Sequence, residues 1–214
     1  MRAFTTSHLC TGLVLVGMAL TGSSARADRS VLGPTGDTLA PESYRSEFAL
    51  DPQSKSQNRI WLDYSTPQGI ELEAERLDLT GERRKGYALN IQYPITYSLV
   101  ASLPAIAVGV RDCMGTGDEH GAFYLAATKS IRLSDRQHRF AKEFKIDVGV
   151  GTGRIGGLFV GAQTRLASGL FLQAEVYQRR PNITVGLPIT RHFDARAYSL
   201  DNHFYYGLSF SVQR

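Results

Sequence analysis

The sequence predicts an all-β protein, an antiparallel up-and-down transmembrane β-barrel of 10–12 strands that follows a cleaved signal peptide. Segment 204–213 alternates without a break, and its apolar residues share one face: Phe204, Tyr206, Leu208, Phe210 and Val212. Because strand side chains point to opposite faces with a period of two, this segment is a strand with one apolar and one polar face. The same pattern recurs through most of the chain, and an export signal precedes it.

The first 27 residues are predicted to be a signal peptide. Arg2 supplies a short basic start, and the apolar run from Leu9 to Leu20 is too short to cross a bilayer, which needs about 20 residues. The small-x-small sequence before residue 28 predicts cleavage after Ala27. Cleavage removes Arg2, Arg26 and no acid, so the formal net charge of +4 falls by two. The basic charge is therefore no argument for a nucleic-acid partner.

The remaining chain is predicted to have two parts. Residues 28–57 are rich in Pro and Gly and are expected to be an irregular N-terminal arm, with a short strand near Phe48 as an option. Residues 58–214 are expected to form the barrel, from eleven alternating segments: 60–64, 70–74, 87–95, 106–110, 121–131, 144–150, 158–162, 170–176, 183–187, 193–197 and 204–213. Bacterial single-chain barrels have even strand numbers, so one segment is misassigned or the arm adds a twelfth strand.

The composition of the two strand faces favours a membrane barrel over a soluble one. The polar faces mix small residues such as Gly161 and Gly207 with charges of both signs, as suits a narrow lumen in which each charge needs a partner. The apolar faces carry almost no charge, and Arg or Lys at mid-bilayer costs about 2–4 kcal/mol. The alternative is a soluble periplasmic lipocalin-like barrel that binds a small or lipidic ligand in an apolar interior.

Several motifs in the C-terminal half are similar to those of a known family. Segments 104–112, 115–117 and 124–129 read Pro-Ala-Ile-Ala-Val-Gly-Val-Arg-Asp, Gly-Thr-Gly and Tyr-Leu-Ala-Ala-Thr-Lys. Glycine-rich strand pairs follow at 149–153 and 157–162, and then the segments 174–177 and 182–187. These motifs resemble the YjbH-like family of outer-membrane barrels tied to exopolysaccharide production. The resemblance implies an outer-membrane location, lipid contact, and polysaccharide or polysaccharide-export proteins as partners.

Candidate binding residues come from the charged faces of the strands. A lumen network is predicted from five of them: Asp147, Arg165, Glu175, Asp194 and Arg196. It could line a selective pore or a sugar site, or it could consist of paired charges that fill a small barrel.

A second polar cluster combines Arg111 and Asp112 with the segment 118–120. A solvated loop is the expectation here, because sequence neighbours on a loop rarely converge on one metal ion. The family resemblance makes Asp112 and the Gly115-Thr116-Gly117 turn structural candidates, since glycine permits tight turns. We expect no metal and no cofactor.

An enzymatic role is not expected. A barrel acyl hydrolase or transferase is the alternative, and it needs a serine activated by a histidine. His192, His203 and Ser199 are close in sequence, yet neither histidine shares a strand face with a serine at a two-residue spacing. The glycine-rich stretch 149–157 lacks the lysine and the helix of a phosphate-binding loop. The sequence therefore predicts a non-enzymatic outer-membrane barrel of the cell envelope.

Overall fold

The computed structural model describes residues 31–53, 58–78, 85–97, 103–117, 119–133 and 140–212. The predicted signal peptide, residues 1–27, and its cleavage site lie outside these ranges. Within the described residues, none of the helices has the length and apolar character to cross a bilayer.

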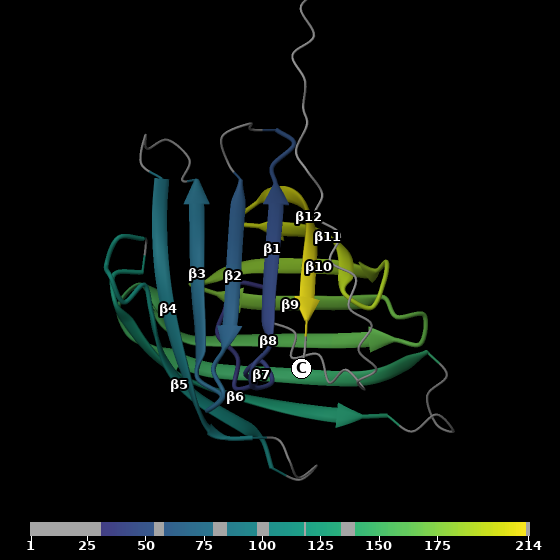
Figure 1. The fold of residues 1–214 in the computed structure, drawn as a ribbon, viewed down its shortest axis with the longest axis horizontal. Coiled ribbons are helices and arrows are strands. Elements are labelled where there is room, and N and C mark those ends of the chain that lie inside the picture. The colour runs from purple at the N-terminus through teal and green to yellow at the C-terminus, as the bar shows by residue number, and fades with distance from the viewer. Residues whose placement is uncertain are drawn as a thin grey trace, which may run out of the picture.

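Twelve antiparallel strands close into a barrel, as the alternation predicted. Their bounds are β1 (Tyr44–Leu50), β2 (Arg59–Ser65), β3 (Glu71–Asp78), β4 (Lys85–Thr96), β5 (Ala105–Arg111), β6 (Ala122–Arg132), β7 (Ala141–Gly151), β8 (Gly157–Leu166), β9 (Phe171–Tyr177), β10 (Arg180–Pro188), β11 (Phe193–Leu200) and β12 (His203–Val212). Each strand pairs with its neighbours in the chain, and β1 pairs with β12. Figure 1 shows β1 to β4 and β12 standing across β5 to β9, which run behind them at a steep angle.

The arm supplies the twelfth strand. The barrel begins at Tyr44, inside the segment 28–57 that we expected to be irregular, and β1 is the strand near Phe48. Tyr44, Phe48 and Leu50 point outward, whereas Arg45 and Glu47 are buried. β1 pairs with β12 over its whole length, from Tyr44 opposite Val212 to Leu50 opposite Tyr206. This even count of twelve agrees with the rule for single-chain bacterial barrels.

The apolar side chains face outward and the charged ones face inward. Leu172, Val185 and Leu208 are 38%, 38% and 45% exposed. Glu175 and Arg196 are only 5% and 6% exposed. This polarity is the reverse of a water-soluble protein, in which charged residues are almost never fully buried unless they are paired.

Glycines on the inner face make room for aromatic rings of the neighbouring strand. A Cβ on Gly186 would lie 1.9 Å from Phe171, and one on Gly149 would lie 2.0 Å from Phe159. In both pairs the glycine stands directly opposite the aromatic residue in the strand register. At these two positions, only a glycine leaves room for the aromatic ring opposite it.

The two ends of the barrel are distinguished by the chain termini. At one end, here called the termini end, β1 begins and β12 finishes; the other is called the opposite end. The connection from β6 to β7 lies at the termini end, and residues 134–139 of it are outside the described residues. At the opposite end, the glycine-rich stretch forms the end of β7, the short 3-10 turn η1 (Gly153–Ile155) and the start of β8.

Candidate functional site

The candidate site is the interior of the barrel, which contains a chain of buried charged groups. Among the described residues, nine acidic and four basic residues are buried. The buried acids are Glu47, Asp51, Asp63, Glu73, Glu75, Asp112, Asp147, Glu175 and Asp194, and the bases are Arg45, Arg111, Lys145 and Arg196. Because a buried charge is stable only when it is paired or hydrogen-bonded, the contacts of these groups define the site.

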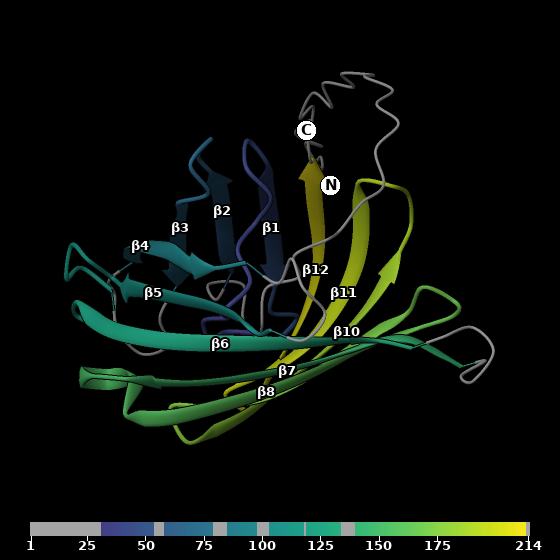
Figure 2. The ribbon, with the colours of Figure 1, turned by 90° about the horizontal axis from the view of Figure 1, so that it is seen from below.

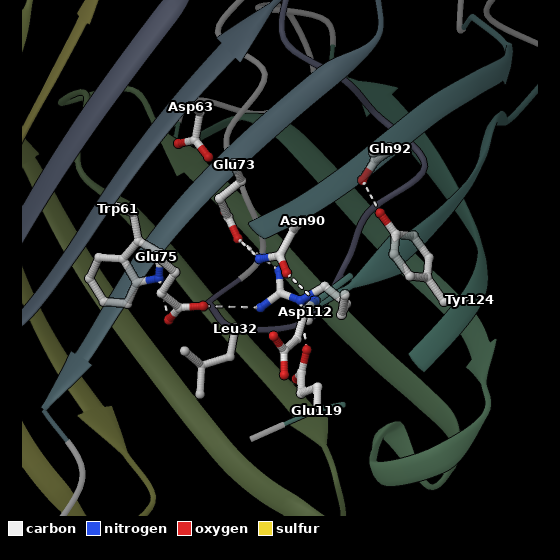
Figure 3. A network of polar contacts seen from close by, with 12 residues as sticks. Leu32, Trp61, Asp63, Glu73, Glu75, Asn90, Gln92, Asp112, Glu119 and Tyr124 are labelled. Atoms are coloured by element: carbon white, nitrogen blue, oxygen red, sulfur yellow. Dashed lines mark hydrogen bonds and ion pairs between the residues drawn. The ribbon is translucent and has the colours of Figure 1, made fainter. Parts of the chain in front are cut away.

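Arg111, at the end of β5, is the centre of the densest cluster. Figure 3 shows Glu73, Glu75 and Glu119, the three acids of this cluster. The Arg111 guanidinium group lies 3.0 Å from Glu73, 3.5 Å from Glu75 and 2.9 Å from Glu119. Glu75 also accepts a hydrogen bond from the indole N–H of Trp61 at 2.7 Å. β3 places Glu73 and Glu75 on the same inner face because they are two residues apart. Three carboxylates thus surround one arginine.

The loop between β5 and β6 folds back over this cluster. The Asp112 carboxylate accepts hydrogen bonds from the backbone N–H groups of Thr116, Gly117 and His120, at 3.0, 2.9 and 2.8 Å. This closed loop carries Glu119 inward to Arg111, where Glu119 also accepts a hydrogen bond from the Tyr177 hydroxyl. Asp112 is fully buried, so the expectation of a solvated loop is wrong at this position.

An N-terminal segment, residues 31–43, lies inside the barrel and ends where β1 begins. In Figures 1 and 2 it runs between the wall of β1 and β2 and the wall of β6 to β8. Val31 and Leu32 pack in the same buried cluster as Trp61 and Tyr177, towards the opposite end. Leu39 donates its backbone N–H to Glu71 at 2.8 Å, close to the termini end. The segment therefore extends along the lumen.

Glu175 on β9 binds the first part of this segment. Its carboxylate accepts the backbone N–H of Leu32 at 2.7 Å and that of Gly33 at 3.0 Å. The side-chain amide of Asn182, on the neighbouring strand β10, donates to the same carboxylate at 3.0 Å. A charge-assisted hydrogen bond is roughly twice as strong as a neutral one, so this carboxylate is a specific anchor.

The middle of the segment is held by β4, β6 and β7. Gly36 donates its backbone N–H to the Thr128 hydroxyl at 2.8 Å, and that hydroxyl donates in turn to Asp147. Asp37 lies 3.1 Å from the Lys145 ammonium group. Gln92 donates to the backbone carbonyls of Thr35 and Asp37 at 3.0 and 3.1 Å.

Another buried cluster links β11 to β1 across β12. Arg196 on β11 lies 2.8 Å from Glu47 on β1, and the Tyr198 hydroxyl donates to the other oxygen of Glu47 at 2.5 Å. β12 stands between these strands, and its inner face carries Gly207 and Ser209 at this level. Small residues on β12 let the β11 side chains reach β1.

A cavity of about 30 Å³ lies beside the segment. It is lined by Pro34, Arg45, Glu71, Gln92 and Arg111, among others. Such a volume holds water molecules and no sugar ring.

The five predicted lumen residues lie in the same interior but not in one site. Arg196 and Asp194 are a pair, 3.8 Å apart. Asp147 and Glu175 serve different parts of the N-terminal segment, as described above. Arg165, near the end of β8, is partly exposed and lies over the Phe171 ring at 5.6 Å. A ligand-binding role for these five residues stays a prediction.

The groups that make the densest contacts cannot be recognised from the alternation of the strands. Glu73 and Glu75 stood on a polar strand face, but nothing in the alternation indicates that Arg111 lies opposite them across the interior. Glu119 was assigned to a loop, and its return to the lumen depends on the hydrogen bonds to Asp112. The binding of segment 31–43 by Glu175 joins groups 142 residues apart, which a local pattern cannot reveal.

The two histidines considered for an acyl-transfer site, His192 and His203, lie at different ends of the barrel. In the part of the chain that the structure describes, no group of three or more His, Cys, Asp or Glu side chains is placed to hold a metal ion. His192, before β11, contacts the Ser211 carbonyl at the termini end. His203, the first residue of β12, lies 3.8 Å from Asp51 at the opposite end.

One comparison with known proteins gives a match. The YjbH family model, described as exopolysaccharide biosynthesis protein YbjH, matches residues 72–187, more than half of the chain. The chain belongs to this family. The match runs from β3 into β10, so it includes Arg111, its three carboxylate partners and Glu175, and it leaves out segment 31–43, β1, β2, β11 and β12. No curated protein and no solved structure matches the chain.

Proposed function

We propose that the protein is an outer-membrane β-barrel that supports the production or export of an exopolysaccharide and catalyses no reaction itself. The observation that carries this proposal is the reversed polarity of the barrel. Large apolar side chains are exposed around the circumference, for example Leu62, Phe123 and Leu158 at 54%, 62% and 75%. The interior, in contrast, contains paired charges.

Physical chemistry connects this polarity to a lipid environment. A monomer in water rarely exposes an apolar patch larger than a few hundred Å², whereas here the outward residues of most strands are apolar. In lipid, every backbone polar group must be satisfied within the structure, and a closed barrel does this because it has no free strand edge. The fold and its outer surface thus suit insertion in an outer membrane.

The link to exopolysaccharide comes from family membership. The family description names exopolysaccharide biosynthesis, and the match spans eight of the strands at least in part. We extend that role to this chain as a component of the envelope that contacts the polymer or its export proteins.

The non-enzymatic part of the proposal rests on the positions of the nucleophile and base candidates. His192 lies at the termini end and His203 at the opposite end of the barrel. Ser199 is next to last in β11, near the end that carries His203, but it stands opposite Ile183 and the exposed Phe204, whereas His203 stands opposite the buried Leu200 on the other face. Nucleophilic catalysis needs a hydrogen bond between serine and histidine, which these positions do not provide.

The lipocalin-like alternative has less support. A soluble barrel that binds a lipidic ligand needs an apolar interior, and the inner faces here carry Glu47, Glu73, Glu175 and Arg196. We therefore do not propose a lipid-carrier function.

The test uses cell fractionation and gel mobility. The protein is expressed with its own leader in a Gram-negative host, and the outer membranes are isolated. We expect the protein in that fraction, with a faster-migrating band when the sample is not boiled. Recovery in the soluble periplasmic fraction would contradict the proposal. In the native host, deletion of the gene should lower exopolysaccharide output, and the His192→Ala/His203→Ala double variant should restore it as well as the wild type does.

A further inference from the structure

The N-terminal segment 31–43 has no regular secondary structure of its own, yet its first six residues, Val31 to Gly36, are all buried, and so is Leu39. We propose that this segment is a plug that keeps the barrel closed to solutes, and that its release opens the lumen. The proposal rests on the proposed membrane location, because a plug has a function only where the barrel joins two compartments.

The barrel wall binds the segment at specific side chains, which we call the seat: Glu71, Thr128 and Glu175. The segment's backbone N–H groups at Leu32, Gly33, Gly36 and Leu39 each donate to a wall side chain. Three of the four are bound by carboxylates, those of Glu175 and Glu71. A buried N–H group without a partner is costly, so the wall supplies what a strand or helix would otherwise provide.

The fit at Gly36 shows that the seat accepts only one kind of residue. A Cβ at this position would lie 2.4 Å from the Ala105 carbonyl oxygen and 2.5 Å from the Thr128 nitrogen. Both atoms belong to the backbones of β5 and β6, which cannot move aside as a flexible side chain would. A larger residue at position 36 must therefore displace the segment. The substitution changes no residue of the barrel wall.

The remaining free space indicates what the plug excludes. The cavity beside the segment, about 30 Å³, has room for water and not for a sugar ring, as expected for a plug in this position. Passage of any polymer unit through this lumen would then require the segment to leave.

The experiment measures the seat and the closure separately. Wild type and variants are purified from outer membranes in detergent, and the exchange of the amide hydrogens in residues 31–39 is followed by mass spectrometry. The same proteins are then reconstituted into planar lipid bilayers for conductance measurements. We expect slow exchange in this segment of the wild type and no steady conductance.

Two variants remove the seat from different sides. Gly36→Leu acts on the plug, and Glu175→Ala acts on the wall. Glu175→Ala removes a charged acceptor, and one hydrogen bond to a charged group corresponds to roughly a ten- to hundredfold change in an equilibrium, so exchange in the segment should accelerate by about that factor. Gly36→Leu should also accelerate exchange, because the new side chain clashes with the backbones of β5 and β6. Both variants should show steady conductance. Thr38→Leu on the plug and Thr184→Ala on the wall are the matched controls: Thr38 is half-buried, and the Thr184 hydroxyl has no hydrogen-bond partner among the described residues.

The outcomes separate this proposal from the proposed function. Steady conductance in the wild type would overturn the plug, and so would a Gly36→Leu variant that exchanges fast and stays silent. If Gly36→Leu does not give the heat-modifiable band of a folded barrel, Glu175→Ala decides in the same way. A protein that is absent from outer membranes contradicts the proposed location, whereas the exchange of residues 31–39 in the folded protein still shows whether the segment is seated.

Discussion

At the scale of single residues, buried charges such as those of Arg111 and Glu47 are stabilised by charged partners on other strands. Arg111 is the clearest case, because Glu73, Glu75 and Glu119 all lie within 3.5 Å of its guanidinium group. The arginine side chain is 8% exposed, so little water replaces a lost partner.

Replacement of Arg111 should therefore be strongly destabilising. Arg111→Met keeps much of the side-chain volume but leaves three carboxylates without their cation, and removal of one partner of a buried ion pair costs about 3–5 kcal/mol. Urea unfolding of the detergent-solubilised barrel, followed by the loss of the heat-modifiable band, measures this cost. The exposed Lys142 is the control, and Lys142→Met should change the stability by less than about 0.5 kcal/mol.

The glycine and aromatic pairs lead to a second residue-scale prediction. Gly186→Ala places a methyl group 1.9 Å from the Phe171 ring, and such overpacking costs about 1–3 kcal/mol. Phe171→Leu in the same chain should recover part of that loss, because the smaller side chain leaves room for the methyl group. The same urea assay checks this, and a double variant less stable than Gly186→Ala would contradict the account.

At the scale of elements, β1 shows what can and what cannot be predicted from the sequence. Its alternation is clear once its bounds are known, but the strand has only seven residues and lies in a proline-rich segment. Strands β2 to β12 were predicted because alternation is a local property that survives without knowledge of the partners. The contacts of segment 31–43 and the folded-back loop at Asp112 are long-range or depend on side-chain hydrogen bonds, so no local pattern contains them.

The seam between β11, β12 and β1 should show energetic coupling across a strand. Glu47 and Arg196 are 2.8 Å apart although β12 lies between their strands. In a double-mutant cycle with Glu47→Gln and Arg196→Gln, we expect a coupling free energy of about 0.5–3 kcal/mol. Additive effects of the two substitutions on the urea midpoint would show that the pair does not contribute to closure.

At the scale of the whole molecule, the one tryptophan of the chain can be used to test which face of the strands points into the lumen and which points to the lipid. Trp61 is 1% exposed and points into the lumen, where its indole N–H contacts Glu75. Its neighbour Leu62 is 54% exposed on the outer face.

Lipid-phase quenching should distinguish these two positions. In vesicles of brominated phospholipid, the fluorescence of wild-type Trp61 should be quenched weakly. The Trp61→Phe/Leu62→Trp variant should be quenched strongly, because successive strand residues point to opposite faces. Equal quenching of both proteins would contradict the assigned orientation.

The position of residues 31–43 also bears on how the protein assembles. The segment continues directly into β1, and β1 pairs with β12, which follows all the other strands of the barrel in the sequence. A complete ring of strands can be entered only through its two mouths. If the β1–β12 pairing forms last, residues 31–43 are enclosed by the sheet as it curls, and no later threading step is needed. Events that weaken that final pairing would then expose the enclosed segment from the side.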